Sequence, residues 1–170
     1  MRSKTLDGVD QHELMERLHY DPETGDFTWL KSVALRIKPG DAAGYLDKRG
    51  YHKIKLNNSG YRAHRLAWLY MTGEWPDGEI DHINNIPSDN RWCNLRCATH
   101  RQNSCNTKLR VNNKTGYKGV SFNSRLRKYV AQLRRPSGNS HIGVFDTPEE
   151  AHAAYCQEAA RRHKAFANYR

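Results

Sequence analysis

The sequence predicts an α+β protein of two modules, and three observations support this prediction. Short runs of alternating apolar and polar residues, separated by Gly, Pro and Asn, occupy much of the first 60 positions and are typical of strands. Helix-start signals precede apolar residues at helical spacing near both ends of the chain. A final third with its own strand and helix pattern follows an almost purely polar stretch at 107–115.

Residues 10–73 predict a small antiparallel sheet that leads into a helix. Asp10 with Glu13 three positions later is an N-cap pattern, so a helix should begin there. A second helix should follow residue 63 and end at Gly73, because apolar residues recur at helical spacing up to that glycine. Alternating residues predict strands at 26–30, 51–56 and 61–63.

Residues 79–106 predict a strand, a polar loop, a second strand and a polar helix. The first strand covers 79–84, and the loop at 84–90 holds three Asn, a Pro, a Ser and an Asp. Residues 94–96 form the second predicted strand, and residues 98–106 the helix. We assign these residues, together with everything before them, to a first domain at 1–106.

The rest of the chain predicts a linker at 107–115 and a second domain at 116–170. The linker has almost no apolar residues and is expected to order on DNA. The Thr-Pro-Glu-Glu sequence at 147–150 combines three signals for the start of a helix. We therefore expect one helix packed on a three-stranded antiparallel sheet, with strands at 116–122, 128–134 and 141–145.

Composition and charge narrow the class of function. No stretch approaches the ~20 apolar residues that a membrane-spanning helix needs, and we expect no secretory signal, so a membrane role is excluded. The net charge of +10 is uneven, because residues 1–110 carry 17 basic and 14 acidic side chains whereas residues 111–170 carry 11 and four. A strongly basic final third indicates a module that binds a polyanion such as nucleic acid.

Four cysteines raise the alternative of a structural zinc site. Without a secretory signal we expect them to be reduced thiols. No C-x-x-C pair occurs, and structural zinc sites usually begin with one, so zinc is disfavoured. The residues that would form such a site are Cys93, Cys97, His100 and Cys105.

The residues that can carry chemistry gather between positions 81 and 103. Asp81 and Asn103 face each other if the predicted strand and helix pack together, and their oxygens suit Mg²⁺ or Mn²⁺. Two protein ligands leave room for water and phosphate oxygens, as phosphodiester cleavage requires, and His82 would activate the water. The alternative interpretation is structural: a surface Asp-His pair followed by an Asn-rich turn.

Residues 60–106 resemble the HNH homing endonucleases, the ββα-metal nucleases of phage genomes and mobile introns. The resemblance is carried by AHRLAWLYMTGEWPDGEIDHINNIPSDNRWCNLRCATHRQN, and the upstream YDPETGDFTWL resembles the lead-in of that family. It implies a ββα-metal nuclease module with an N-terminal strand-rich extension.

The resemblance also implies roles for particular residues. His82 corresponds to the general base, Asp81 to a metal ligand, and Asn94 to the asparagine that fixes the loop and orients the base. Asn103 corresponds to the second metal ligand of the phage branch. Many members have histidine at that last position, so His100, one turn earlier, is the substitute. Further residues are expected to support the site or contact phosphates: His64, Arg65, Arg96 and Arg101.

Residues 112–169 resemble the plant ethylene-response-factor (Apetala-type) DNA-binding domain. The matching segments are GYKGV, FDTPEEAHAAY and the final FANY. Members of that family lay their three-stranded sheet in the major groove. Plant members usually have an arginine-rich first strand and a tryptophan in the second, so their target sequences do not carry over. The resemblance implies DNA contacts by Lys118, Arg125, Arg127, Tyr129, Gln132 and Arg134.

Together these features predict a homing-type DNA endonuclease that hydrolyses phosphodiesters with Mg²⁺ or Mn²⁺, one ion per site. The family implies 5′-phosphate and 3′-hydroxyl products, double-stranded DNA as partner, and a bacterial cytoplasm hosting a phage or mobile element. One chain has one site, so a monomer would nick DNA and a double-strand break would need a homodimer or two events. The alternatives are a catalytically inactive DNA-binding regulator and an RNA-binding protein.

Overall fold

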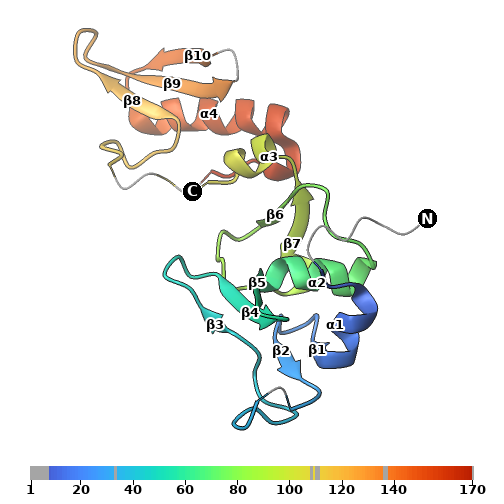
Figure 1. The fold of residues 1–170 in the computed structure, drawn as a ribbon. Helices are drawn as coiled ribbons and strands as arrows, with labels where there is room; N and C mark the ends of the chain where they lie inside the picture. The colour runs from blue at the N-terminus through green and yellow to red at the C-terminus, as the bar shows by residue number, and fades with distance from the viewer. Residues whose placement is uncertain (1–7, 33, 108, 110–111, 136–137, 170) are drawn as a thin grey trace. The chain divides into compact units, whose positions relative to one another are not determined.

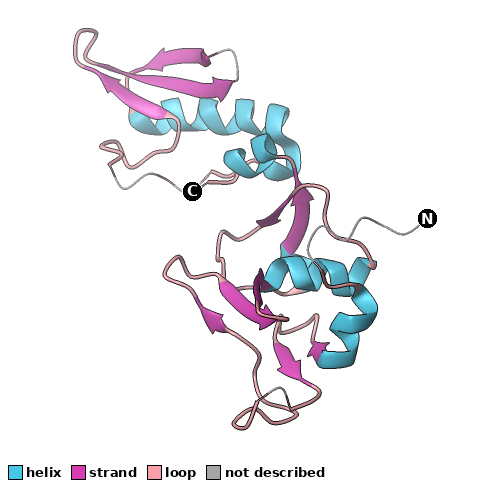
Figure 2. Ribbon diagram, in the orientation of Figure 1, coloured by secondary structure: helices cyan, strands magenta, loops and turns pink. Residues whose placement is uncertain are grey.

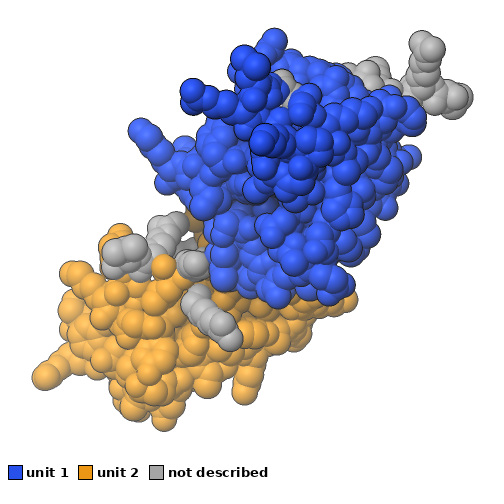
Figure 3. Space-filling model, turned by 90° about the horizontal axis from the view of Figure 1, so that it is seen from below, with its two compact units in different colours: residues 1–100 blue, residues 101–170 orange. Residues whose placement is uncertain are grey.

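The structure is a computed structural model that describes residues 8–32, 34–107, 109, 112–135 and 138–169. Helices alternate with small antiparallel sheets, which confirms the predicted α+β class (Figures 1 and 2). The chain divides into two compact units, residues 1–100 and 101–170, which Figure 3 colours separately. Within the described part of the chain, no helix combines the length and the apolar character that crossing a membrane demands.

The first unit begins with α1 (Gln11–Arg17), capped as predicted, because the Asp10 carboxylate accepts the Glu13 backbone N–H at 2.8 Å. The helix passes directly into β1 (Leu18–Tyr20), which pairs antiparallel with β2 (Phe27–Trp29). The sequence did not predict β1, because its first residue, Leu18, continues the helical spacing of α1. The strand forms because its alternation buries both of its apolar side chains.

A three-stranded sheet and a helix follow, with two of the strands and the helix close to the predicted residues. The sheet orders β3 (Tyr45–Leu46), β4 (His52–Leu56) and β5 (Ser59–Arg62), and β5 leads directly into α2 (Ala63–Thr72). Gly73 caps this helix in the left-handed conformation, with φ at 81°.

The predicted strand–loop–strand–helix is also present. It consists of β6 (Glu79–His82), a short 3₁₀ turn at Trp92–Asn94, β7 (Leu95–Ala98) and α3 (His100–Cys105). β6 and β7 pair antiparallel. Their buried apolar residues join the core of the first unit, which also includes the buried face of α2 and both strands of the first hairpin. This core therefore positions the end of β6.

The second unit has the predicted sheet packed on one helix. Strands β8 (Val120–Asn123), β9 (Lys128–Arg135) and β10 (Gly138–Phe145) form the sheet in the order β10-β9-β8, and α4 (Pro148–His163) covers one face. A further 3₁₀ turn at Lys164–Phe166 follows α4. A complete capping box starts α4, since Thr147 and Glu150 each accept the other's backbone N–H. The core contains Val120, Ala131, Leu133, Ala151, Tyr155 and Ala159.

Strand boundaries in this unit differ from the predicted ones. β8 begins at Val120 instead of residue 116, because Gly116 and Gly119 both adopt positive φ in turns. β10 begins at Gly138, where the sequence predicted a connection; residues 136 and 137 of that connection lie outside the described residues.

Residues 105–107 are bound within the second unit. The Lys118 ammonium donates to the backbone carbonyls of Cys105, at 3.2 Å, and Thr107, at 2.5 Å. Asn168 donates to the Asn106 carbonyl at 3.0 Å. These contacts explain why the compact unit starts before the expected linker at 107–115. A compact unit is not the same as a domain, so the domains at 1–106 and 116–170 stay predictions.

Candidate active site

The end of β6 carries two buried polar side chains in succession. Asp81 is 4% exposed and His82 6% exposed. Successive side chains of a strand point to opposite faces, so His82 shares the core-facing side with buried Ile80, and Asp81 shares the other side with Glu79. The two polar groups therefore have separate environments.

Asp81 is held by an arginine directly across the ladder. Asp81 and Arg96 are register partners, and the Arg96 Nε and Nη2 atoms donate to Asp81 Oδ2 at 2.7 and 2.6 Å. A buried carboxylate needs such a partner, because its isolated charge is strongly disfavoured away from water. The expected phosphate contact by Arg96 stays a prediction, and here its guanidinium compensates a buried charge.

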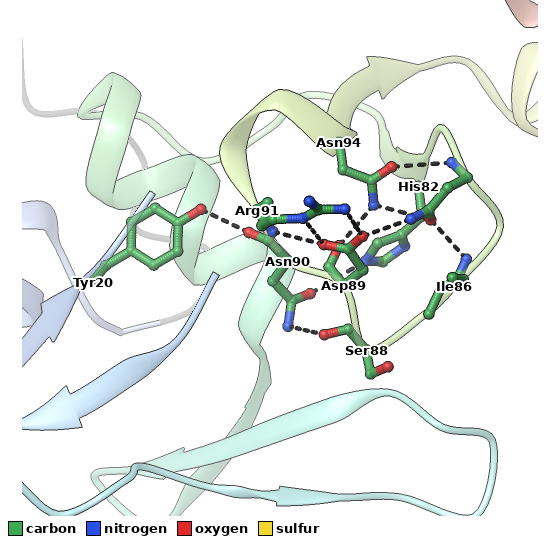
Figure 4. Close-up of polar contacts among 9 residues, drawn as sticks. Tyr20, His82, Ile86, Ser88, Asp89, Asn90, Arg91 and Asn94 are labelled. Atoms are coloured by element: carbon green, nitrogen blue, oxygen red, sulfur yellow. Dashed lines mark hydrogen bonds and ion pairs between the residues drawn. The ribbon is translucent and has the colours of Figure 1, made fainter. Parts of the chain in front are cut away.

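His82 is held by an asparagine of the following loop. His82 Nε2 lies 3.2 Å from Asn90 Oδ1, and both side chains are drawn in Figure 4. Burial lowers the pKa of His82 below its usual value, and the hydrogen bond to Asn90 offsets this effect only in part. The imidazole is therefore biased toward its neutral form, the form that can accept a proton.

Asn94 closes the loop between β6 and β7. Its Nδ2 donates to Asn84 Oδ1 at 3.1 Å and to the Asp89 carbonyl at 2.8 Å, while its Oδ1 accepts the Asn84 backbone N–H at 3.0 Å. Arg91 pairs with the Asp89 carboxylate and lowers the pKa of Asp89 to about 2. These contacts connect residues across the loop (Figure 4). The roles assigned to Asn94 from the resemblance stay predictions.

A second histidine packs against the first. The His64 and His82 rings are 4.9 Å apart and perpendicular, and Tyr51 lies beside both. Burial is the largest cause that lowers the pKa of His64, to about 3, and the nearby His82 lowers it further. Among the described residues, His64 Nδ1 is the buried side-chain polar atom without a hydrogen-bond partner. The neighbouring Arg65 donates to the Gly78 carbonyl and lies over Trp75.

The helix α3 carries the remaining candidates. His100 Nδ1 lies 2.7 Å from Glu79 Oε1, on the same side of β6 as Asp81. Arg101 and Asn103 belong to the second compact unit, so the pairing of Asn103 with Asp81 stays a prediction. In the described part of the chain, no group of three or more His, Cys, Asp or Glu is placed to hold a metal. One carboxylate and one amide would not form such a group.

In the second unit, the expected DNA contacts fall on different surfaces. Gln132 and Arg134 alternate with buried Ala131 and Leu133, so they lie on the sheet face opposite α4. Arg125 and Arg127 are exposed in the β8–β9 connection.

Two other candidates have structural contacts in this unit. The Lys118 ammonium donates to two backbone carbonyls, and burial lowers its pKa. Tyr129 packs against the core on the α4 side, with its ring 5.1 Å from that of Phe122. Of the expected DNA contacts on the strands, the open face therefore presents Gln132 and Arg134.

Sequence reasoning missed Asn90, Tyr20 and Tyr51. Asn90 is 1% exposed and contacts His82, and Tyr20 donates to the Asn90 carbonyl at 2.7 Å. An available signal was the position of Asn90 in a loop already judged polar and adjacent to His82. The Tyr20 contact spans 70 residues and has no local pattern.

Comparison with known protein families finds a match that covers the site. Residues 61–105 match the model of the HNH endonuclease family. The matched segment contains Asp81, His82, Asn94 and Asn103, and runs from β5 to the end of α3.

Two curated proteins are similar to the chain. One is an uncharacterised HNH endonuclease of Acanthamoeba polyphaga mimivirus, 33% identical over 113 residues, which are 65% of this chain and 57% of that protein. The other is protein 3.8 of Escherichia phage T7, 39% identical over 62 residues, or 36% and 51% of the two chains. The chain thus spans about half the length of the curated relatives it matches.

Among solved structures, the chain is similar to the HNH homing endonuclease I-HmuI. The identity is 18% and the TM-score 0.45, over 92% of this chain and 90% of that one.

Proposed function

We propose that the chain is a divalent-metal-dependent DNA endonuclease of the HNH type, which hydrolyses phosphodiester bonds to 5′-phosphate and 3′-hydroxyl ends. The observation that carries the proposal is the end of β6. There a buried histidine, hydrogen-bonded at Nε2, follows a buried carboxylate within the segment that matches the HNH endonuclease model. A base and a metal-binding oxygen on adjacent residues are the groups that phosphodiester hydrolysis requires.

His82 is the general base of the proposed reaction. It accepts a proton from the attacking water, and its lowered pKa keeps it neutral and ready to do so near neutral pH. His64 and Tyr51 pack beside its ring and restrict its rotation. A general base of this kind contributes roughly 10²- to 10⁴-fold to the rate.

Asp81 offers the oxygen chemistry that Mg²⁺ or Mn²⁺ prefers, since its carboxylate is a hard ligand. Arg96 pairs with its charge. Asn103 would complete the ligand pair, with His100 as the substitute. When bound, the ion supplies positive charge for the phosphate and the leaving oxygen. Arg96 holds the Asp81 carboxylate in a fixed orientation through Oδ2.

The second unit supplies DNA binding in this proposal. Residues 111–170 carry 11 basic and four acidic side chains, and the open sheet face bears Gln132 and Arg134. An ethylene-response-factor-like sheet would bind double-stranded DNA through this face. A monomer with one site nicks one strand, and a homodimer cuts both.

The end chemistry of the product tests the proposal. Purified protein is incubated with supercoiled plasmid DNA and Mg²⁺ or Mn²⁺, and the nicked product is treated with DNA ligase. We expect ligase to reseal the nick, because it requires a 5′-phosphate next to a 3′-hydroxyl. Nicks that resist ligase refute the proposed products, and DNA binding without any nicking favours the inactive regulator.

A further inference from the structure

We propose that Asn90 is the positioning residue that orients His82, and that the turn between β1 and β2 holds Asn90 in place. This inference rests on the proposed function, because it takes His82 as the base. It assigns a role to the N-terminal hairpin, which lies outside the segment that matches the HNH endonuclease model.

The Asn90 side chain is fixed at both ends of its amide. Its Nδ2 donates to the Ser88 carbonyl at 3.3 Å, which leaves Oδ1 facing His82 Nε2 at 3.2 Å. An amide oxygen only accepts hydrogen bonds, so His82 Nε2 must carry the proton. In the neutral ring the lone pair then lies on Nδ1. Asn90 therefore selects the tautomer whose proton acceptor is Nδ1.

The Asn90 backbone is held by residues far earlier in the chain. The Tyr20 hydroxyl donates to the Asn90 carbonyl at 2.7 Å, a contact that Figure 4 shows. Tyr20 is 1% exposed, and its ring packs 4.7 Å from Phe27 and 5.7 Å from Tyr70. A tyrosine fixed in the core therefore holds the Asn90 carbonyl next to the hairpin.

The β1–β2 turn makes two further contacts with the same segment. The Trp92 backbone N–H donates to the Pro22 carbonyl at 2.9 Å. Gly25, with φ at 81°, packs so closely that a Cβ there would lie 2.5 Å from the Asn90 carbonyl carbon. The turn and Tyr20 together hold residues 90–92 from one side, while Asn94 closes the loop from within.

The first test measures the contact without using cleavage. In protein labelled with ¹⁵N-histidine, the His82 Nε2–H proton should be seen by NMR as a slowly exchanging ring resonance, assigned by its loss in His82→Ala. We expect Asn90→Ala to abolish this resonance and Asn90→Asp, which keeps an acceptor oxygen, to retain it. A resonance that persists unchanged in Asn90→Ala overturns the inference, whatever the nuclease activity.

The second test separates positioning from folding and binding. For plasmid nicking, Asn90→Ala should lower kcat by about 10²-fold, the effect of a base misplaced by about 1 Å, with KM unchanged. Asn90→Asp should restore part of kcat. An equal change in KM, or no change in kcat, contradicts a positioning role.

Tyr20→Phe provides a second test of the inference if Asn90→Ala does not fold. It removes one hydroxyl from a core ring, and we expect faster exchange of the His82 ring proton and a several-fold lower kcat. The matched control is Tyr45→Phe, at a tyrosine 61% exposed in β3, which should change neither. Equal behaviour of the two variants overturns the role of the hairpin. If wild-type protein never nicks DNA but the ring resonance depends on Asn90, the nuclease proposal fails and the Asn90–His82 contact stands.

Discussion

At the residue scale, the chemistry depends on two adjacent side chains that the strand sends to opposite faces. Asp81 has a guanidinium partner at Oδ2, and His82 has an amide partner at Nε2. Each of the two side chains therefore has its own partner. The pair can therefore present a carboxylate and a neutral base in the same short segment.

The buried His64 makes the first unit sensitive to acid. Its folded pKa of about 3 lies below the ordinary histidine pKa of 6.5, so the unfolded state takes up the proton first. The contribution of His64 to the free energy of unfolding is therefore fully present above pH 6.5, and it is lost as the pH falls from there to about 3. The loss is about 1.4 kcal/mol per pH unit within that window.

Denaturant unfolding followed by tryptophan fluorescence checks this prediction. The signal reports the first unit, because all four tryptophans lie in it: Trp29, Trp68, Trp75 and Trp92. From pH 7.5 to 5, His64→Phe should lose about 2 kcal/mol less of its unfolding free energy than wild type. The same loss in both proteins would contradict the burial of a neutral His64.

The residues of the site differ in how far the sequence predicts them. Asp81 and His82 are adjacent, and Asn94 follows in a short loop, so local spacing and a family resemblance suffice to name them. Asn90 escaped because its role depends on where its amide points. That direction is set by Ser88 and, through the backbone, by Tyr20, which a local pattern does not reveal.

At the element scale, the sheet of the second unit lies against α4 because one glycine lets it approach. Gly119 has φ at 75°, and a Cβ there would lie 2.7 Å from Tyr155 Cγ. Tyr155 is buried in the core beneath the sheet. Gly119 is therefore required both by its backbone conformation and by its contact.

We expect Gly119→Ala to destabilise the second unit by about 2 to 5 kcal/mol, from left-handed strain plus overpacking. The matched control is Gly116→Ala, which has the same kind of φ, at 76°, but open space where the Cβ would lie. It should cost only about 1 to 2 kcal/mol. Amide hydrogen exchange of α4 measures both, and equal effects would show that Tyr155 does not limit the approach.

Helices and strands were predicted correctly where the sequence signal is local. The Asp10 cap and the Thr147 capping box start α1 and α4 at the expected residues. β1 was missed because α1 passes directly into it without a turn residue. Leu18 fits the helical spacing, and burial in the tertiary structure decides that a strand forms instead. The start of β8 moved because Gly116 and Gly119 adopt turn conformations that the alternating pattern hides.

At the scale of the whole molecule, the basic side chains are in excess in residues 111–170, and we expect the DNA-binding contacts there. Arg134→Ala should weaken DNA binding and lower the salt slope by about 0.9, the value for one lost phosphate contact. The matched control is Arg161→Ala, which removes the same charge from α4, where Glu158 already pairs with it. Fluorescence anisotropy at several salt concentrations measures both. Unchanged affinity and slope in Arg134→Ala would show that the open sheet face is not the DNA reader.

The central claim is that His82 takes the proton in metal-dependent DNA hydrolysis. The most direct measurement compares nicking of supercoiled plasmid by wild type, His82→Ala and the control His12→Ala, with Mg²⁺ or Mn²⁺ and with chelator. His12 lies exposed on α1. We predict nicking by wild type and His12→Ala only with metal, and a loss of roughly 10² to 10⁴ in His82→Ala with DNA binding retained. Undiminished turnover by His82→Ala would contradict the account.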